Sequence, residues 1–110
     1  MTKVTNDYYV LFGREIVPCD VFTWVTWHQM TNHTISRDSV GEILVSTIFF
    51  GLNQRSQPNS PPLIFETMVF GGSFGEYRER YETYSEAEAG HQRVLSMVMD
   101  ERILGSEFIG

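Results

Sequence analysis

The chain has 110 residues, a formal net charge of −6 and 42% hydrophobic residues, a composition typical of an ordinary globular domain and not of a disordered chain. Its one lysine and seven arginines form no dense cluster, which argues against direct binding of nucleic acid. Cys19 is the one cysteine, so these residues can form neither an intramolecular disulfide nor a cysteine-rich zinc site. We find no apolar run of the roughly 18 residues that span a bilayer and no signal-peptide core. We therefore expect a cytoplasmic protein.

The first part of the chain predicts a hairpin followed by a helix. Tyr8–Phe12 and Glu15–Val17 have strand composition and flank a glycine turn. Pro18 cannot donate to a strand ladder and is expected to end the second strand. Asp20 is a suitable N-cap for a helix over Val21–Met30. Because aromatic residues of that helix lie outside its apolar stripe, we expect the helix to be covered on two sides.

Two apolar runs, Ile43–Phe50 and Leu63–Phe70, predict the central strands of a sheet, and Thr34–Asp38 predicts a shorter strand before them. Both central runs are rich in β-branched and aromatic residues and have the length of strands. Apolar residues occur at both alternate sets of positions, so both faces are expected to be covered. The polar, proline-rich segment Leu52–Pro62 is longer than a hairpin needs and is expected to be an exposed loop.

The last part of the chain predicts an edge strand and a long helix. Glu76–Tyr84 alternates in the manner of an edge strand, whose charges discourage aggregation. A Ser-x-x-Glu capping box at 85–88 precedes a helix over Glu86–Ile103, and Gly105 offers a C-terminal stop. Gly90, a poor helix former, is expected to allow close approach of this helix to the sheet.

These elements predict one α+β domain over residues 1–110, with loose termini at 1–7 and 104–110. An antiparallel sheet of about five or six strands would pack two helices, mainly on one face. The second face would then expose apolar side chains, and patches of that kind usually mark a partner. We therefore expect a homo-oligomer that associates through this face or through the edge strand Arg78–Tyr84.

Glu66 is a carboxylate in the middle of a central apolar strand, where it is costly to bury unless it is paired. It could act as a catalytic acid or base, or it could pair with Arg78 or Arg80 on the following strand. The ion pair is favoured, because no nucleophile or set of metal ligands accompanies Glu66.

Two histidines, His28 and His91, lie on the apolar stripes of their helices. With Glu66 and Cys19 they could form a mixed metal site, but neither helix offers a second ligand four residues later. Histidines satisfied within the core are the favoured interpretation. We therefore expect neither a metal nor a cofactor.

Arginines and tyrosines around the edge strand are the main candidates for binding. Arginine together with tyrosine is typical of interface hot spots and of pockets that stack nucleotides, although a solvated edge strand is an equally good interpretation. The complete candidate binding set is Glu66, Arg78, Arg80, Tyr77, Tyr81, Tyr84 and His91.

Three segments carry a resemblance to a known family: VSTIFFGLN (45–53), PPLIFETMVFGG (61–72) and ERYETYSEAEAGH (79–91). The resemblance spans roughly residues 8–95, and the family that these segments resemble consists of small uncharacterised proteins of bacteriophages and actinobacteria. The chain departs from the family pattern at Asn53-Gln54, where the family often has Asp-His. The resemblance implies a phage or prophage accessory protein of the host bacterial cytoplasm, and it assigns no activity.

Three functions are considered from these observations. The favoured one is a non-enzymatic accessory protein that binds a host protein, such as a defence component. The alternative is a binder of a small nucleotide-like ligand at an oligomer interface, using Arg78, Arg80 and the tyrosines. A small enzyme that uses Glu66 and a histidine is the least favoured.

Overall fold

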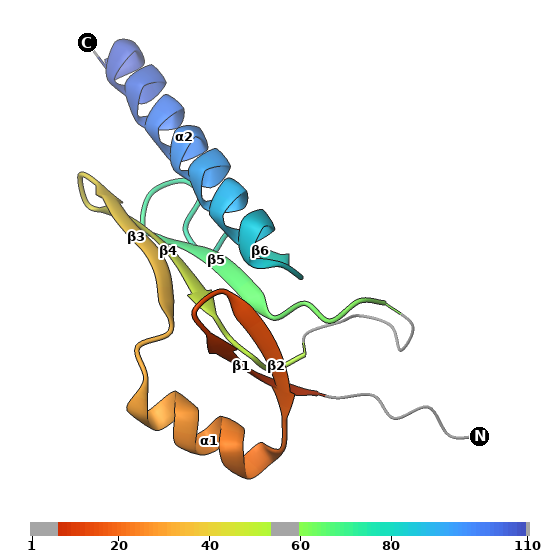
Figure 1. The fold of residues 1–110 in the computed structure, drawn as a ribbon. Helices are drawn as coiled ribbons and strands as arrows, with labels where there is room; N and C mark the ends of the chain where they lie inside the picture. The colour runs from red at the N-terminus through yellow and green to blue at the C-terminus, as the bar shows by residue number, and fades with distance from the viewer. Residues whose placement is uncertain (1–6, 54–59, 110) are drawn as a thin grey trace.

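The computed structural model describes residues 7–53 and 60–109, with side chains described up to Glu101 (Figure 1). Within these residues the chain forms six strands and two helices in the order β1-β2-α1-β3-β4-β5-β6-α2. The strands form two antiparallel sheets, the hairpin β1-β2 and the four-stranded sheet β3-β4-β5-β6. The predicted α+β class is confirmed. The strands divide between two sheets, whereas a single sheet was expected.

The N-terminal hairpin consists of β1 (Tyr8–Phe12) and β2 (Glu15–Cys19). Contrary to the prediction, β2 continues through Pro18, which lies opposite Tyr9. Proline is tolerated at this position because each strand of a two-stranded sheet has one free edge. The hairpin joins the end of the main sheet through the N–H of Tyr9, which donates to the carbonyl of Gly51 at 2.7 Å.

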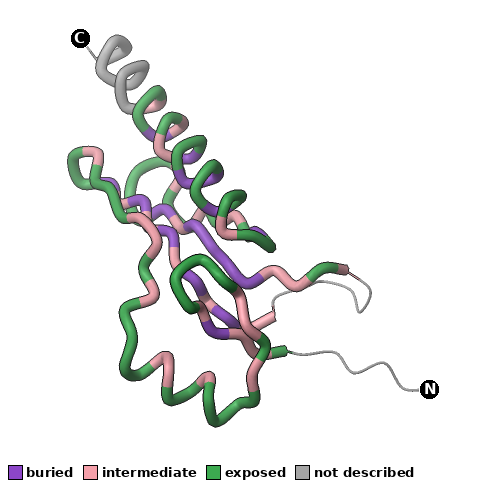
Figure 2. Tube along the Cα trace, viewed as in Figure 1, coloured by how far each residue is buried: buried purple, intermediate pink, exposed green. Residues whose placement is uncertain are grey.

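The first helix, α1 (Val21–Met30), has the predicted bounds. Asp20 caps it, because the Oδ1 atom of Asp20 accepts the N–H of Thr23 at 2.8 Å. No residue of α1 is buried, and Phe22 and Met30 are each 81% exposed. The expectation that this helix is covered on two sides is therefore wrong for a single chain. It packs against β1 on one side and is open on the other (Figures 1 and 2).

The main sheet consists of β3 (Thr34–Val40), β4 (Ile43–Phe49), β5 (Phe65–Phe70) and β6 (Arg78–Tyr81). The two apolar runs are its central strands, as predicted. The outer strand β3 is longer than expected, and β6 is shorter. Within the predicted loop between the central strands, residues 54–59 lie outside the described residues.

The second helix, α2 (Tyr84–Ile109), begins earlier than predicted and continues through Gly105, so the expected stop is not observed. Its N-terminus is capped by Thr83, whose Oγ1 accepts the N–H of Glu86 at 3.1 Å and donates to the carboxylate of Glu86 at 2.9 Å. The capping box therefore lies two residues before the predicted one, with the same Thr-or-Ser-x-x-Glu spacing. Of the predicted loose termini, 1–6 and 110 lie outside the described residues, and 104–109 are helical.

The core lies between α2 and one face of the main sheet (Figure 2). Alternate residues of the central strands are buried on this face, beneath one stripe of α2. The members of this buried layer are Ile43, Val45, Thr47, Phe49, Phe65, Thr67, Val69, Ala87, His91, Val94 and Val98. In the opposite alternate set of the sheet, Leu44, Ile48 and Met68 are half-buried.

Gly90 brings α2 close to the sheet, as predicted. A methyl group added at Gly90 would overlap the ring of Tyr81, which is buried and held by a hydrogen bond from its hydroxyl to the Oγ1 atom of Thr67 at 3.0 Å. The ring therefore cannot move aside without breaking that bond. Glycine at this position lowers the helix propensity of α2 but allows α2 to pack closely against β6.

We predict that Gly90→Ala destabilises the protein by about 1–3 kcal/mol, the usual cost of overpacking a core. Helix propensity alone predicts the opposite sign, a stabilisation of about 1 kcal/mol. Urea unfolding followed by circular dichroism measures the difference. A variant more stable than the wild type would show that Tyr81 does not lie against Gly90.

Candidate functional site

The main sheet separates the predicted binding residues onto opposite faces. Residues paired across an antiparallel ladder share a face, and Arg78 and Arg80 lie opposite Met68 and Glu66. These arginines therefore lie on the face that α2 leaves open. Tyr81 and His91 are buried on the other face, beneath α2, and so they cannot share a site with the arginines.

The other two tyrosines of the predicted set also lie away from Arg78 and Arg80. Tyr77 packs into the core beneath α2 and donates to the carboxylate of Glu79 at 2.6 Å. Tyr84 packs on Phe65, and the guanidinium of Arg14 lies 4.1 Å from the centre of its ring. The described part of one chain therefore does not assemble the stacking pocket that was expected for a nucleotide-like ligand.

Glu66 is 8% exposed and is paired with Arg80, whose Nε atom donates to Glu66 Oε2 at 2.9 Å. The sequence-based preference for an ion pair is confirmed. The pair crosses directly from β5 to β6, because Glu66 and Arg80 are register partners. It allows a carboxylate to lie among apolar side chains at the centre of the open face.

A chain of hydrogen bonds runs through the core beneath α2. The hydroxyl of Tyr81 donates to Thr67 at 3.0 Å, the Oγ1 atoms of Thr67 and Thr47 lie 2.5 Å apart, and Thr47 Oγ1 lies 2.6 Å from His91 Nδ1. His91 Nε2 lies 2.7 Å from the carboxylate of Asp38 at the surface. The core interpretation of His91 is therefore confirmed, and sequence analysis missed Asp38 and both threonines.

The donors of this network can be ordered from its surface end. The carboxylate of Asp38 only accepts, so His91 donates to it through Nε2. When Nδ1 carries no proton, it accepts the hydroxyl proton of Thr47, and the hydroxyl of Thr67 then donates to Thr47. Asp, His and a hydroxyl are also the residue types of a catalytic triad. Here Thr47 is completely buried, so its hydroxyl is out of reach of a substrate, and the arrangement supports a structural role.

A second polar cluster joins α1 to the end of β4. His28 Nε2 lies 2.5 Å from the carbonyl oxygen of Phe50, and the indole N–H of Trp24 donates to the same oxygen at 3.3 Å. Because that carbonyl only accepts, His28 donates to it through Nε2, and the Nδ1 atom of His28 lies 3.0 Å from His33 Nε2. Burial, together with the neighbouring His28, lowers the pKa of His33.

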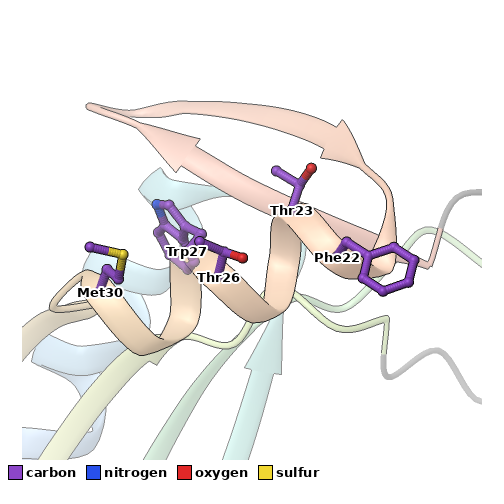
Figure 3. A pocket seen from close by; sticks show the side chains of 5 residues that line it. All are labelled: Phe22, Thr23, Thr26, Trp27 and Met30. Atoms are coloured by element: carbon purple, nitrogen blue, oxygen red, sulfur yellow. The ribbon is translucent and has the colours of Figure 1, made fainter.

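The outer side of α1 carries the most exposed apolar residues that the structure describes. Figure 3 shows Phe22 and Met30 beside a shallow hollow of about 490 Å³, which is also lined by Trp27, a half-buried residue whose ring packs on Phe49. We call this surface the α1 stripe: Phe22, Thr23, Thr26, Trp27 and Met30. α1 contains no Asp, Glu, Lys or Arg, so the stripe is uncharged.

The face of the main sheet opposite α2 is a second partly apolar surface. We call it the open sheet face, and it consists of Arg37, Leu44, Ser46, Ile48, Glu66, Met68, Phe70, Arg78 and Arg80. A small hollow of about 90 Å³ lies between β4 and β5 on this face. Phe70 is 47% exposed there. Sequence analysis expected one face of the sheet to expose apolar side chains, and the alternate set with Leu44, Ile48, Met68 and Phe70 is the one that α2 leaves open.

Comparison of the chain with protein-family models, curated proteins and solved structures gives no match. The resemblance to phage and actinobacterial proteins therefore stays a prediction. Within the described ranges, no group of three or more His, Cys, Asp or Glu side chains is placed to hold a metal ion. Neither α1 nor α2, over its described length, is long and apolar enough to cross a membrane. Burial and the adjacent Asp20 raise the pKa of Cys19, which makes its thiol less reactive.

We predict that Thr47→Val destabilises the protein by about 1–3 kcal/mol, because it leaves the Nδ1 atom of His91 buried without its partner and leaves Thr67 with the hydrogen bond from Tyr81 alone. Thr31→Val is the matched control, since Thr31 is exposed, has an extended backbone conformation and lies outside the α1 stripe, so its change should fall within about 0.5 kcal/mol. Urea unfolding measures both. Equal stability of the two variants would contradict the network.

We also predict that the His33 cluster makes stability depend on pH. Because the folded pKa of His33 lies below its ordinary value of 6.5, the unfolded chain binds the proton first. The stability that neutral His33 contributes is complete above that value and is lost as the pH falls through it towards the folded pKa. His33→Gln should flatten the melting temperature over this window. An NMR titration that gives His33 of the folded protein a pKa at or above 6.5 would contradict the prediction.

Proposed function

We propose that this chain acts by binding other proteins and not by catalysis, and that the α1 stripe is a docking surface. One observation carries the proposal: Phe22 and Met30 are each 81% exposed on the same side of one helix. A helix with apolar side chains on all sides is normally buried, and monomers rarely expose contiguous apolar patches. We therefore propose that a second chain packs against the side of α1 that is exposed in a single chain.

A second copy of the same chain fits the α1 stripe. The stripe is uncharged, so two chains that each carry a net charge of −6 can approach along it without like charges at the contact. Phe22, Thr26 and Met30 follow one another at intervals of four residues, which forms a straight row on the helix. Across a two-fold axis, Phe22 of one copy would lie near Met30 of the other, with the small Thr26 residues at the centre.

The resulting homodimer would act as an accessory protein that holds a host protein. The resemblance to phage proteins supports a bacterial target, such as a defence component, and the cytoplasm as the place of action. Glu66, His28 and His91 are the side chains that were considered as catalytic acids or bases. Each of them is hydrogen-bonded to neighbouring groups, which favours binding over catalysis. A nucleotide-like ligand has less support, since the arginines and tyrosines lie on opposite faces of the sheet.

We predict that the intact chain is a dimer at micromolar concentration and that Phe22→Asp makes it a monomer. Size exclusion with light scattering should give twice the 12.7 kDa of one chain for the wild type and 12.7 kDa for the variant. The substitution should leave the fold intact, because Phe22 contributes little to the core of a single chain. Circular dichroism checks this.

Phe12→Asp is the matched control for this experiment. Phe12 is a phenylalanine, is 65% exposed and lies on the hairpin outside the α1 stripe. The Phe12→Asp variant should remain a dimer. A wild-type monomer, or an equal loss of association in both variants, would show that α1 is not the contact between copies.

A further inference from the structure

The open sheet face is positively charged on a chain that is acidic as a whole. Arg37 lies opposite Ser46, Arg78 opposite Met68, and Arg80 opposite Glu66, which places all three arginines on this face. Glu66 is the one acidic residue that the four strands place there, and it is paired with Arg80. Three cations and one carboxylate give the face a charge of +2, whereas the whole chain carries −6.

The middle of the same face is largely apolar, apart from Ser46 and the paired Glu66, and the described helices do not cover it. Ile48 on β4 and Met68 and Phe70 on β5 line the hollow between the central strands, and Leu44 lies opposite Phe70. α2 packs on the opposite face, and α1 packs against the hairpin. The arrangement is therefore a largely apolar strip along the middle of the sheet, with an arginine on each edge strand, Arg37 and Arg78, that has no ion-pair partner among the described residues.

The spacing of these features limits what can bind. Three strand intervals of about 4.8 Å separate β3 from β6, so the backbones that carry Arg37 and Arg78 are about 14 Å apart. A single extended strand or helix, about 10 Å across with its side chains, fits between them. Its apolar side chains would contact the central strip. Its carboxylates would reach the guanidinium groups on both sides, which bind carboxylates in a bidentate manner.

We propose that the open sheet face binds an acidic amphipathic segment of a partner protein. A second copy of this chain is a poor occupant, because face-to-face contact would bring the arginines of both copies together. Single-stranded nucleic acid is also less suitable, because it needs a row of aromatic rings on which bases stack. Phe70 is the one aromatic residue that the strands place on this face.

This inference extends the proposed function, since it gives the chemistry of the protein that the chain would hold. It rests on a different surface from the α1 stripe. Each can therefore fail without the other. A result obtained with Phe22→Asp separates them, because that substitution lies on α1 and leaves the open sheet face unchanged.

The test uses a short fluorescein-labelled helical peptide that carries Leu along one face and Glu on both flanks of that face. The readout is the fluorescence anisotropy of this peptide as the intact chain is added at low salt. The same peptide with Lys in place of Glu and a labelled oligothymidine are the comparison probes. The variant is the double charge reversal Arg37→Glu with Arg78→Glu. Arg14→Glu with Arg93→Glu is the matched control, because it changes the net charge equally, and the ion-pair partners of its arginines lie away from the open sheet face.

The acidic peptide should bind, and the Arg37/Arg78 reversal should weaken it about tenfold or more, since each exposed charge pair changes from attraction to repulsion. The Arg14/Arg93 control and Phe22→Asp should bind it as the wild type does. The inference is overturned if the lysine peptide binds equally well, if both double reversals weaken binding to the same extent, or if no binding is detected up to millimolar concentration. Tighter binding of oligothymidine than of the acidic peptide overturns it in favour of nucleic acid.

Discussion

The packing of α2 against one face of the main sheet is the constraint on which the rest of the molecule depends. It combines a close approach at Gly90, where the ring of Tyr81 occupies the space of a side chain, with the hydrogen-bond chain through Thr67, Thr47 and His91. Buried polar groups are tolerated only with partners, so this network restricts α2 to one position on the sheet. In this position α2 covers one face of the main sheet, and the opposite face stays open to a partner.

The two surfaces proposed for binding follow from that arrangement, and they differ in chemistry. The α1 stripe is uncharged and apolar, which suits contact between identical acidic chains. The open sheet face is apolar with an arginine on each edge, which suits an acidic segment of a different protein. The Glu66–Arg80 pair connects the two properties of the sheet face, because it neutralises the carboxylate at its centre and leaves Arg37 and Arg78 to set its charge.

Local patterns were sufficient to predict most elements of the fold. The N-cap Asp20, the bounds of α1 and the two central strands follow from capping chemistry and from strand-length apolar runs. The division into two sheets did not follow, because it depends on long-range contacts: β1 meets the segment after β4 through an isolated bridge between Tyr8 and Leu52 and not through a ladder. The continuation of α2 through Gly105 was also missed, since one glycine lowers helix stability without ending a helix.

The candidate site was predicted only in part, for a related reason. The pairing of Glu66 with Arg80 follows from strand order, and alternation alone placed Leu44, Ile48, Met68 and Phe70 in one set. The partners of His91 come from β3, β4 and β5, so no spacing along the chain reveals them. A threonine at the middle of each central apolar strand was the available signal for that network. The alternation of residues does not show which face of the sheet α2 covers. Because α2 covers the face of Tyr81, the tyrosines lie apart from Arg78 and Arg80.

The central claim is that α1 presents an apolar surface which a second chain covers. Hydroxyl-radical footprinting of the methionines at increasing protein concentration tests it directly. Met30 lies on the α1 stripe, and Met99, an exposed methionine on α2, is the internal reference. Oxidation of Met30 should be fast in dilute solution and should fall as the dimer forms, while that of Met99 stays constant. Equal and undiminished oxidation of Met30 at every concentration would contradict the account.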